Sequence, residues 1–330
     1  MKGGIVASGT MAPMSDGLHL LVPFAATEAP QARAVLAGLE LPRLQGLLAR
    51  LEPQPPVDDG EMALSMPHEH VLADALGLPG TDGLRPWAAS QVMQAGGNAG
   101  ADGWAWITPC HWRLGTDHGV MQHPQDLQLD GDESQALLAA IRPYFEEDGI
   151  ALQYDAPTRW LARGPLFATL PTASLDRVIG RVIHPWMARG DAGRPLRRLQ
   201  QEMQMLLYTH PVNEERSRGG QLPVNSFWAS GTGALPAAAA PRLPAGLQVA
   251  HALRDMALLA DWDGWRNAWQ QLDADDCARL RAALDQGRPV ALTLCGERRA
   301  RTWRSAGSGW GRRLSALWSR PKAAEWLADL

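Results

Sequence analysis

The sequence has few lysines, few cysteines and no long apolar run. Only Lys2 and Lys322 are lysines, so arginine carries nearly all of the positive charge, and a lysine base or Schiff base is disfavoured. The three cysteines, Cys110, Cys277 and Cys295, fit neither a disulfide framework nor a paired-cysteine zinc site, which indicates a reducing compartment. No apolar run approaches the roughly 18 residues that a membrane helix needs, and no apolar signal segment follows Lys2. We therefore expect a cytoplasmic protein without membrane contact.

Positive and negative charges are nearly balanced. The 330 residues include 31 lysines and arginines and 35 aspartates and glutamates, which gives a formal net charge of −4. This balance excludes binding of nucleic acid by bulk positive charge, so we expect no nucleic-acid partner and only local anion sites. Hydrophobic residues make up 45% of the chain and charged residues 20%, which excludes long disorder, collagen and coiled coil.

Short apolar segments alternate along the chain with stretches of helical periodicity. Strands are predicted at 19–25, 104–108, 150–154, 224–228, 247–253 and 289–295. This alternation favours an α/β fold with a mainly parallel sheet and helices on both faces. One helix carries a stripe of tryptophans that is typical of a core, namely Trp262, Trp265 and Trp269. The last thirty residues interleave arginine with tryptophan, which predicts two amphipathic helices packed on the domain; contact with nucleic acid or a membrane surface is the alternative.

The densest group of polar side chains follows the strand at 104–108. It consists of His111, Arg113, Asp117 and His118. Open α/β sheets place their ligands at the carboxyl ends of strands. The aspartate and histidines can hold a metal ion or act as general acid and base, and Arg113 can hold an anion. The alternative is a buried loop whose side chains bond to backbone groups.

Two arginines are expected one turn apart on a helix from 174 to 182. Arg177 and Arg181 lie away from the apolar stripe of that helix, so together they can clamp a phosphate or a carboxylate. A solvated helical face is the alternative.

A second mixed polar group follows the next helix. His210, Asn213 and Arg216 are expected in a turn, and with Asn225 on the following strand they can form an anion pocket. The alternative for His210 is a histidinium held at a helix C-terminus by the helix dipole.

Two smaller features carry opposing interpretations. Asp130 and Asp132 can bind Mg²⁺ through their carboxylates, but Asp132 with Gln135 also has the spacing of a helix capping box. Cys295 follows a strand and can be a thiol nucleophile if a base and positive charge surround it. A buried structural cysteine is the alternative.

Part of the chain resembles a known family. The segment 208–236, YTHPVNEERSRGGQLPVNSFWASGTGALP, resembles a segment of the archaeal-type, cofactor-independent phosphoglycerate mutases of the alkaline phosphatase superfamily. The matching residues are His210, Pro211, Val212, Asn213, Arg216, Gly219, Asn225, Trp228, Gly231 and Gly233. The whole sequence also resembles the RpfE-type regulatory proteins of proteobacteria. The segments that carry this second resemblance are LSMPHEH, TPCHWRLGTDH, YFEEDGI, TASLDRVIGR, LRRLQQEMQMLLYTHPVN, LPVNSFW and LTLCGER.

The resemblance to the mutases implies a fold, a metal site and a nucleophile. It implies a reduced alkaline-phosphatase-like α/β core at 1–157 and 223–300, a helical insert at 158–222, and here a basic, tryptophan-rich tail at 301–330. It also implies two metal ions, such as Mn or Zn, and a hydroxyl nucleophile. The family's Asp-Gly metal site at the end of the first strand is replaced here by Pro23, Phe24, Ala25 and Ala26, and no Asp-His pair follows Ala234.

These departures predict a pseudoenzyme. Alanine and phenylalanine cannot hold a pair of cations, so we expect a regulatory protein that has no metal cofactor and binds a small anionic or phosphorylated ligand or a protein partner. The alternative is an active mutase or phosphatase. Its rearranged metal site would consist of His111, Asp117, His118, Asp130 and Asp132.

Overall fold

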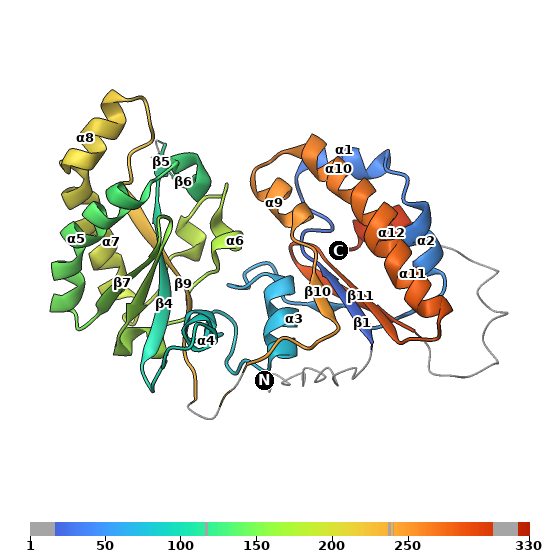
Figure 1. Cartoon of the computed structure of the whole chain (residues 1–330). Coiled ribbons are helices and arrows are strands. Elements are labelled where there is room, and N and C mark those ends of the chain that lie inside the picture. The colour runs from blue at the N-terminus through green and yellow to red at the C-terminus, as the bar shows by residue number, and fades with distance from the viewer. Residues whose placement is uncertain (1–16, 116–117, 237–238, 240, 306–322) are drawn as a thin grey trace, which may run out of the picture. The chain divides into compact units, whose positions relative to one another are not determined.

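Two units, each with its own β-sheet, make up the chain (Figure 1). The computed structural model describes residues 17–115, 118–236, 239, 241–305 and 323–330. The first unit comprises Met1–Gly60, Pro67–Gly77 and Arg242–Leu330, and the second comprises Glu61–Met66 and Leu78–Pro241. Within the first unit, blue elements from early in the chain pair with orange elements from late in the chain (Figure 1).

These boundaries differ from the predicted core and insert. The predicted division at residue 157 falls between β7 (Ala151–Ala156) and β8 (Arg159–Arg163). The two strands pair antiparallel across a short turn. A boundary there would split a hairpin, so both strands belong to the second unit.

The centre of the first sheet is parallel. β1 (Leu18–Val22) lies between β10 (Leu247–Val249) and β11 (Val290–Cys295) and runs parallel to both. These strands match the segments predicted at 19–25, 247–253 and 289–295, although the residues from Ala252 onward form a helix.

The other edge of the first sheet is antiparallel. β12 (Arg299–Arg304) pairs antiparallel with β11, and the short strands β2 (Glu52–Pro53) and β3 (Val57–Asp58) pair with β12. The predicted tail at 301–330 therefore begins inside a strand. Its tryptophans Trp310 and Trp318 lie outside the described residues.

Helices cover both faces of the first sheet, as predicted. Leu20 and Val22 of β1 point to one face, where they pack against several helices. Leu21 points to the opposite face because strand side chains alternate, and it packs in a cluster with side chains of α3 (Pro67–Leu76). The helices on the first face are α1 (Pro30–Ala37), α2 (Pro42–Leu48), α9 (Ala252–Leu258), α10 (Trp262–Leu272), α11 (Ala278–Asp285) and α12 (Ala323–Ala328). A π-helix (Asp273–Cys277) joins α10 to α11.

The predicted tryptophan core is confirmed. Trp265 and Trp269 are both 0% exposed, and their rings meet edge to face with centroids 6.2 Å apart. Trp303 of β12 is also buried and packs edge to face on Trp326 of α12. These two tryptophans join the predicted tail to the core of the first unit.

The second sheet is antiparallel throughout. Its strand order is β7-β8-β4-β9, with β4 at Gly103–Cys110 and β9 at Ser226–Ala234. A separate hairpin joins β5 (Trp112–Leu114) to β6 (Gly119–Met121). The prediction of a mainly parallel sheet is therefore correct only for β10, β1 and β11. The strand β8 lies inside the predicted helical insert.

A β-bulge interrupts the pairing of β4 with β9. Gly231 of β9 has φ +64°, and a Cβ there would lie 2.7 Å from the ring of Trp106, so this position requires glycine. The register shifts between Trp104 and Trp106. Gly231 and Gly233, two of the residues that match the family, thus lie inside a strand here.

Two long helices of the second unit pack on its sheet. Leu137 and Phe145 of α5 (Gly131–Glu147) and Leu199 and Met203 of α7 (Arg194–Tyr208) are buried in one cluster with β4, β8 and β9. The other helices are α4 (Trp87–Gln94), α6 (Leu175–Val178) and α8 (Pro211–Arg218), with 3₁₀ turns at Pro124–Leu127, Pro165–Ala168 and His184–Trp186. No helix of the described residues is long and apolar enough to span a bilayer.

A polar row crosses the first sheet and gives it a pH dependence. His19 Nε2 lies 2.8 Å from Thr293 Oγ1, which lies 2.8 Å from Thr302 Oγ1. Burial, together with the positive charge of Arg304, lowers the pKa of His19 to about 4. As the pH falls below about 6.5, His19 therefore takes up a proton in the unfolded chain before it does so in the folded chain. The contribution of neutral His19 to folding stability is present in full above about pH 6.5 and is lost as the pH falls to about 4.

His19→Gln is expected to remove this part of the pH dependence. For the wild type, His19 alone lowers the free energy of unfolding by about 2 kcal/mol between pH 7.5 and pH 5. Urea unfolding of both proteins at the two pH values measures the difference. Equal losses in wild type and variant would show that His19 is protonated equally in the folded and unfolded chain.

Candidate functional site

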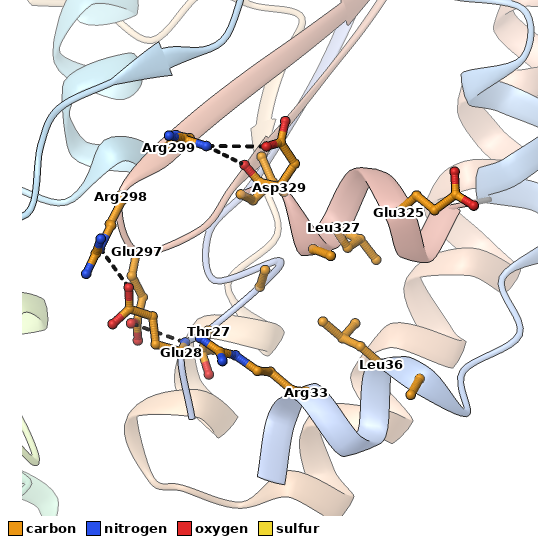
Figure 2. A pocket seen from close by; sticks show the side chains of 14 residues that line it. Thr27, Glu28, Arg33, Leu36, Glu297, Arg298, Arg299, Glu325, Leu327 and Asp329 are labelled. Atoms are coloured by element: carbon orange, nitrogen blue, oxygen red, sulfur yellow. Dashed lines mark hydrogen bonds and ion pairs between the residues drawn. The ribbon is translucent and has the colours of Figure 1, made fainter. Parts of the chain in front are cut away.

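A cavity of about 720 Å³ lies in the first unit, where β1 and β11 end (Figure 2). Its wall consists of residues 26–28 after β1, part of α1, residues 297–299 at the turn from β11 into β12, and residues 325 and 327–330. The volume falls within the range of small-molecule sites. Carboxyl ends of parallel strands are also where open α/β sheets bind ligands.

Most charges around this cavity neutralise one another. Arg298 Nε lies 2.7 Å from Glu28 Oε1, and the Glu28 backbone N–H donates to Glu297 Oε2 at 3.3 Å. Arg299 bonds to Asp58 at 2.8 Å and to Asp329 at 3.3 Å. The hydrogen bond from Arg299 holds the pKa of Asp58 below its usual range. These pairs fix the turn between β11 and β12 but leave little charge for a ligand.

Arg33 is different because its guanidinium forms no hydrogen bond or ion pair with any described residue. It is exposed on α1 and extends towards the segment that carries Thr27 and Glu28 (Figure 2). Thr27 Oγ1 accepts the Ala29 N–H at 3.2 Å, which leaves the hydroxyl hydrogen of Thr27 as a second donor. Arg33 and Thr27 together offer donors to an anion at one end of the cavity.

The opposite part of the cavity has an apolar wall, beside which the Glu325 carboxylate of α12 also lines the cavity. Leu36 and Ala37 come from α1, and Leu327 and Ala328 come from α12. The side chains of Leu36 and Leu327 point into the space between the two helices (Figure 2). The cavity thus pairs a donor end with an apolar wall.

The end of β1 offers no metal ligands. Ala25 and Ala26 are buried, and neither side chain has a donor atom. Phe24, just before them, has φ +53°, and its carbonyl accepts a hydrogen bond from Trp265 Nε1 at 3.1 Å. The residues at this strand end therefore do not fit the metal pair that the family resemblance implies.

Cys295 is a structural cysteine. It is 0% exposed, and burial raises the pKa of its thiol well above the usual value. Its carbonyl accepts the Ala25 N–H at 2.8 Å. A neutral, buried thiol cannot act as a nucleophile.

In the second unit, the structure brings His111, Asn213 and Asn225 together but uses them for structure. His111 Nδ1 lies 2.8 Å from the Pro223 carbonyl oxygen. Asn225 accepts the Trp112 N–H at 2.7 Å and donates to the Trp112 carbonyl at 2.9 Å. Within the group at 111–118, the alternative of side chains bonded to backbone groups thus applies to His111, whereas Arg113 and His118 are exposed.

Arg216 and His210, the other two residues of the predicted anion pocket, also form structural hydrogen bonds. Arg216 is 0% exposed and bonds to Glu133 at 2.5 Å and to the carbonyls of Leu222 and Leu127. His210 precedes α8, where its Nδ1 accepts the Val212 N–H at 3.3 Å. Partial burial lowers the pKa of His210. His210 lies between the end of α7 and the start of α8, and because its Nδ1 accepts a hydrogen bond there, the structure does not support the alternative of a histidinium.

The four described ligands of the alternative metal site do not gather in one cluster. His118 and Arg113 are exposed on the β5–β6 hairpin, and Asp117 lies outside the described residues. None of His111, His118, Asp130 and Asp132 belongs to a group of three or more described ligand residues whose atoms lie within 4.8 Å of one another.

Asp130, not Asp132, caps α5. The Asp130 side chain accepts the Glu133 N–H at 2.8 Å, and Glu133 accepts the Asp130 N–H in return. Asp132 lies exposed in the first turn. The capping box is therefore placed two residues before the predicted one, because the helix begins at Gly131.

The predicted arginine clamp is absent. Helix α6 ends at Val178, and Gly180 then adopts φ +71°, so Arg177 and Arg181 are not one helical turn apart. Arg177 is 1% exposed; its guanidinium donates to the Ser65 carbonyl at 2.7 Å and lies over the Trp186 ring. Arg181 lies half-buried after the turn.

Arg33 and Thr27 are site residues that the sequence did not predict. In the sequence, only their place after the first predicted strand could have indicated a role in ligand binding, because open α/β sheets bind ligands at the carboxyl ends of their strands. The partner segment at 325–330 has no such signal, because it comes from the far end of the chain.

Comparisons with solved structures give distant likenesses, two of which are as follows. One is to a cofactor-independent phosphoglycerate mutase from Thermoplasma acidophilum DSM 1728, with 13% identity, coverage of 88% of this chain and 90% of the other, and a TM-score of 0.36. Another is to the PH0037 protein from Pyrococcus horikoshii, with 12% identity, 88% coverage of each chain and a TM-score of 0.41. TM-scores below 0.5 and identities this low establish neither a shared fold nor a shared activity. No family model and no curated protein matches the sequence.

Proposed function

We propose that the protein is a non-catalytic regulatory protein that binds a small organic anion in the cavity at the ends of β1 and β11. Arg33, which pairs with no described residue, is the observation that carries this proposal. Its guanidinium would hold the carboxylate or phosphate group of the ligand, and the Thr27 hydroxyl would donate a second hydrogen bond. The wall from Leu36 and Leu327 would cover an apolar body.

The absence of metal ligands at the end of β1 supports binding over turnover. Ala25 and Ala26 stand where a two-metal phosphoryl transfer needs clustered carboxylates and imidazoles. Phosphoglycerate also has no apolar part to cover Leu36 and Leu327, whereas an anion with a short alkyl or aryl chain has one. The resemblance of the sequence to RpfE-type regulatory proteins agrees with this assignment, and we propose no metal cofactor.

Arg33→Ala is expected to weaken binding of hexyl phosphate and hexanoate at least about tenfold, because a charge-assisted hydrogen bond contributes about 1.5–3 kcal/mol. Isothermal titration calorimetry of wild type and variant measures the change. Arg266→Ala is the matched control, because Arg266 is a half-exposed arginine of α10 in the same unit and pairs only with Asp263. This control should bind like the wild type.

Two results would contradict the proposal. Equal affinity in wild type and Arg33→Ala would remove Arg33 from the ligand site. Stoichiometric Mn or Zn in the purified protein, together with interconversion of 2- and 3-phosphoglycerate, would establish the active mutase or phosphatase instead.

A further inference from the structure

The three most exposed large hydrophobic side chains among the described residues lie around one hollow. Leu114 is 69% exposed, Met205 77% and Tyr208 85%. All three line a cavity of about 610 Å³ in the second unit, which we call the α7–α8 groove. Single exposed apolar residues are ordinary, but a cluster around a hollow is typical of an interaction site.

Helix α7 presents a second apolar face to this groove. Leu199, Met203 and Leu207 face the core of the unit. Met205 and Tyr208 lie three residues apart, which places them on one face of the helix, and both remain exposed. Burial in the core therefore does not account for these two side chains.

The floor of the groove is held rigidly. Asn213 donates to the carbonyls of Leu207 and Val224 at 2.8 and 2.7 Å and accepts the Val224 N–H at 2.8 Å. Asn225 forms its paired hydrogen bonds with Trp112. These bonds join α7, α8, β5 and the segment before β9, so a partner would meet a surface that is already ordered.

One charge faces the groove. Glu214, in the first turn of α8, is the only charged side chain among the described residues of its lining, and it forms no ion pair with any of them. The remaining polar lining residues near it, Gln204 and Ser217, are uncharged. A partner that fits this groove therefore has apolar side chains and a positive charge.

We propose that the α7–α8 groove docks an amphipathic helical segment of a partner protein, with apolar anchors between Leu114, Met205 and Tyr208 and a basic residue opposite Glu214. Tyrosine, tryptophan and methionine are enriched at protein interfaces, and a helix laid in an apolar groove is a recurring mode of peptide recognition. This site is in a different unit from the anion cavity and does not depend on it.

Phage display on the full-length protein tests the proposal. Random peptides about three helical turns long are selected on the wild type, depleted only on the protein-free support, and then measured on Met205→Glu. Met62→Glu is the matched control, since Met62 is also exposed, at 52%, and belongs to the same unit but does not line the groove. Circular dichroism of both variants should match the wild type, because both side chains are exposed.

The expected peptides have two apolar residues three or four positions apart and a lysine or arginine beside them. Their affinity should fall at least tenfold in Met205→Glu and stay unchanged in Met62→Glu, and Glu214→Lys should weaken the basic peptides more than alanine-substituted versions. The proposal fails if the selected peptides bind Met205→Glu as well as the wild type or carry no basic residue. It also fails if light scattering detects a wild-type dimer that Met205→Glu dissociates, since a second copy would then cover the groove.

Discussion

Arg216→Ala is expected to lower the free energy of unfolding of the second unit by about 3–5 kcal/mol, the usual effect of breaking a buried ion pair. The Arg216 side chain is fully buried and forms three different hydrogen bonds. Its removal leaves the Glu133 carboxylate without its cation and the carbonyls of Leu127 and Leu222 without a donor. The same change also opens a cavity beneath α8.

Urea unfolding measures this loss, and hydrogen exchange of residues 207–225 shows whether it is centred on α8. Arg218→Ala is the control on the same helix; Arg218 is exposed, so its removal should change stability by less than about 0.5 kcal/mol. Arg216→Lys should recover only part of the loss, because an ammonium group cannot reach three separated acceptors in the plane of a guanidinium. A stable Arg216→Ala protein with unchanged exchange would show that these bonds contribute little.

Trp265→Ala should destabilise the first unit by about 3–5 kcal/mol, the typical cost of emptying a buried aromatic position. Trp265 is 0% exposed and meets the rings of Trp262 and Trp269 edge to face at 6.3 and 6.2 Å. Its Nε1 also holds the Phe24 carbonyl at the end of β1. Because Phe24 adopts a left-handed backbone that costs energy, loss of this bond should also distort the neighbouring anion cavity.

Two substitutions separate packing from hydrogen bonding at this position. Trp265→Phe keeps most of the ring volume and removes the hydrogen bond to Phe24, so it should cost less than Trp265→Ala but still weaken binding of hexyl phosphate. Trp262→Ala, at a half-buried position of the same helix, should cost less stability and leave binding intact. Urea unfolding and calorimetry measure the two properties independently. Unaltered binding in Trp265→Phe would mean that Phe24 keeps its conformation without this bond.

The sequence predicts correctly those features that depend only on residues close together in the chain. The stripe of α10 and the apolar runs of β1, β4 and β11 were predicted because their period identifies the buried face directly. The tryptophans of α10 were assigned to the core for the same reason. The missing donors at Pro23, Phe24, Ala25 and Ala26 were also visible in the sequence, because alanine, proline and phenylalanine side chains cannot coordinate a cation in any fold.

The hydrogen-bond partners of polar side chains could not be predicted from the sequence, because the two members of each pair lie far apart in the chain. His111 meets Pro223 across 112 residues, and Arg216 meets Glu133 across 83. A histidine or arginine in a predicted turn is therefore compatible with an anion pocket and with a buried structural bond. Only the fold shows which backbone groups need these donors.

By itself the sequence determined where the buried strands β1, β4 and β11 lie, that the tryptophans of α10 belong to the core, and which chemistry the end of β1 cannot support. The tertiary structure decided that the second sheet is antiparallel, that Arg177 is buried rather than solvated, and that Arg33 is the arginine of the cavity that pairs with no described residue. The physical reason is the same in each case. Hydrophobic periodicity specifies the buried face of an element, whereas strand direction and side-chain pairing depend on contacts between segments that the chain brings together only after it folds.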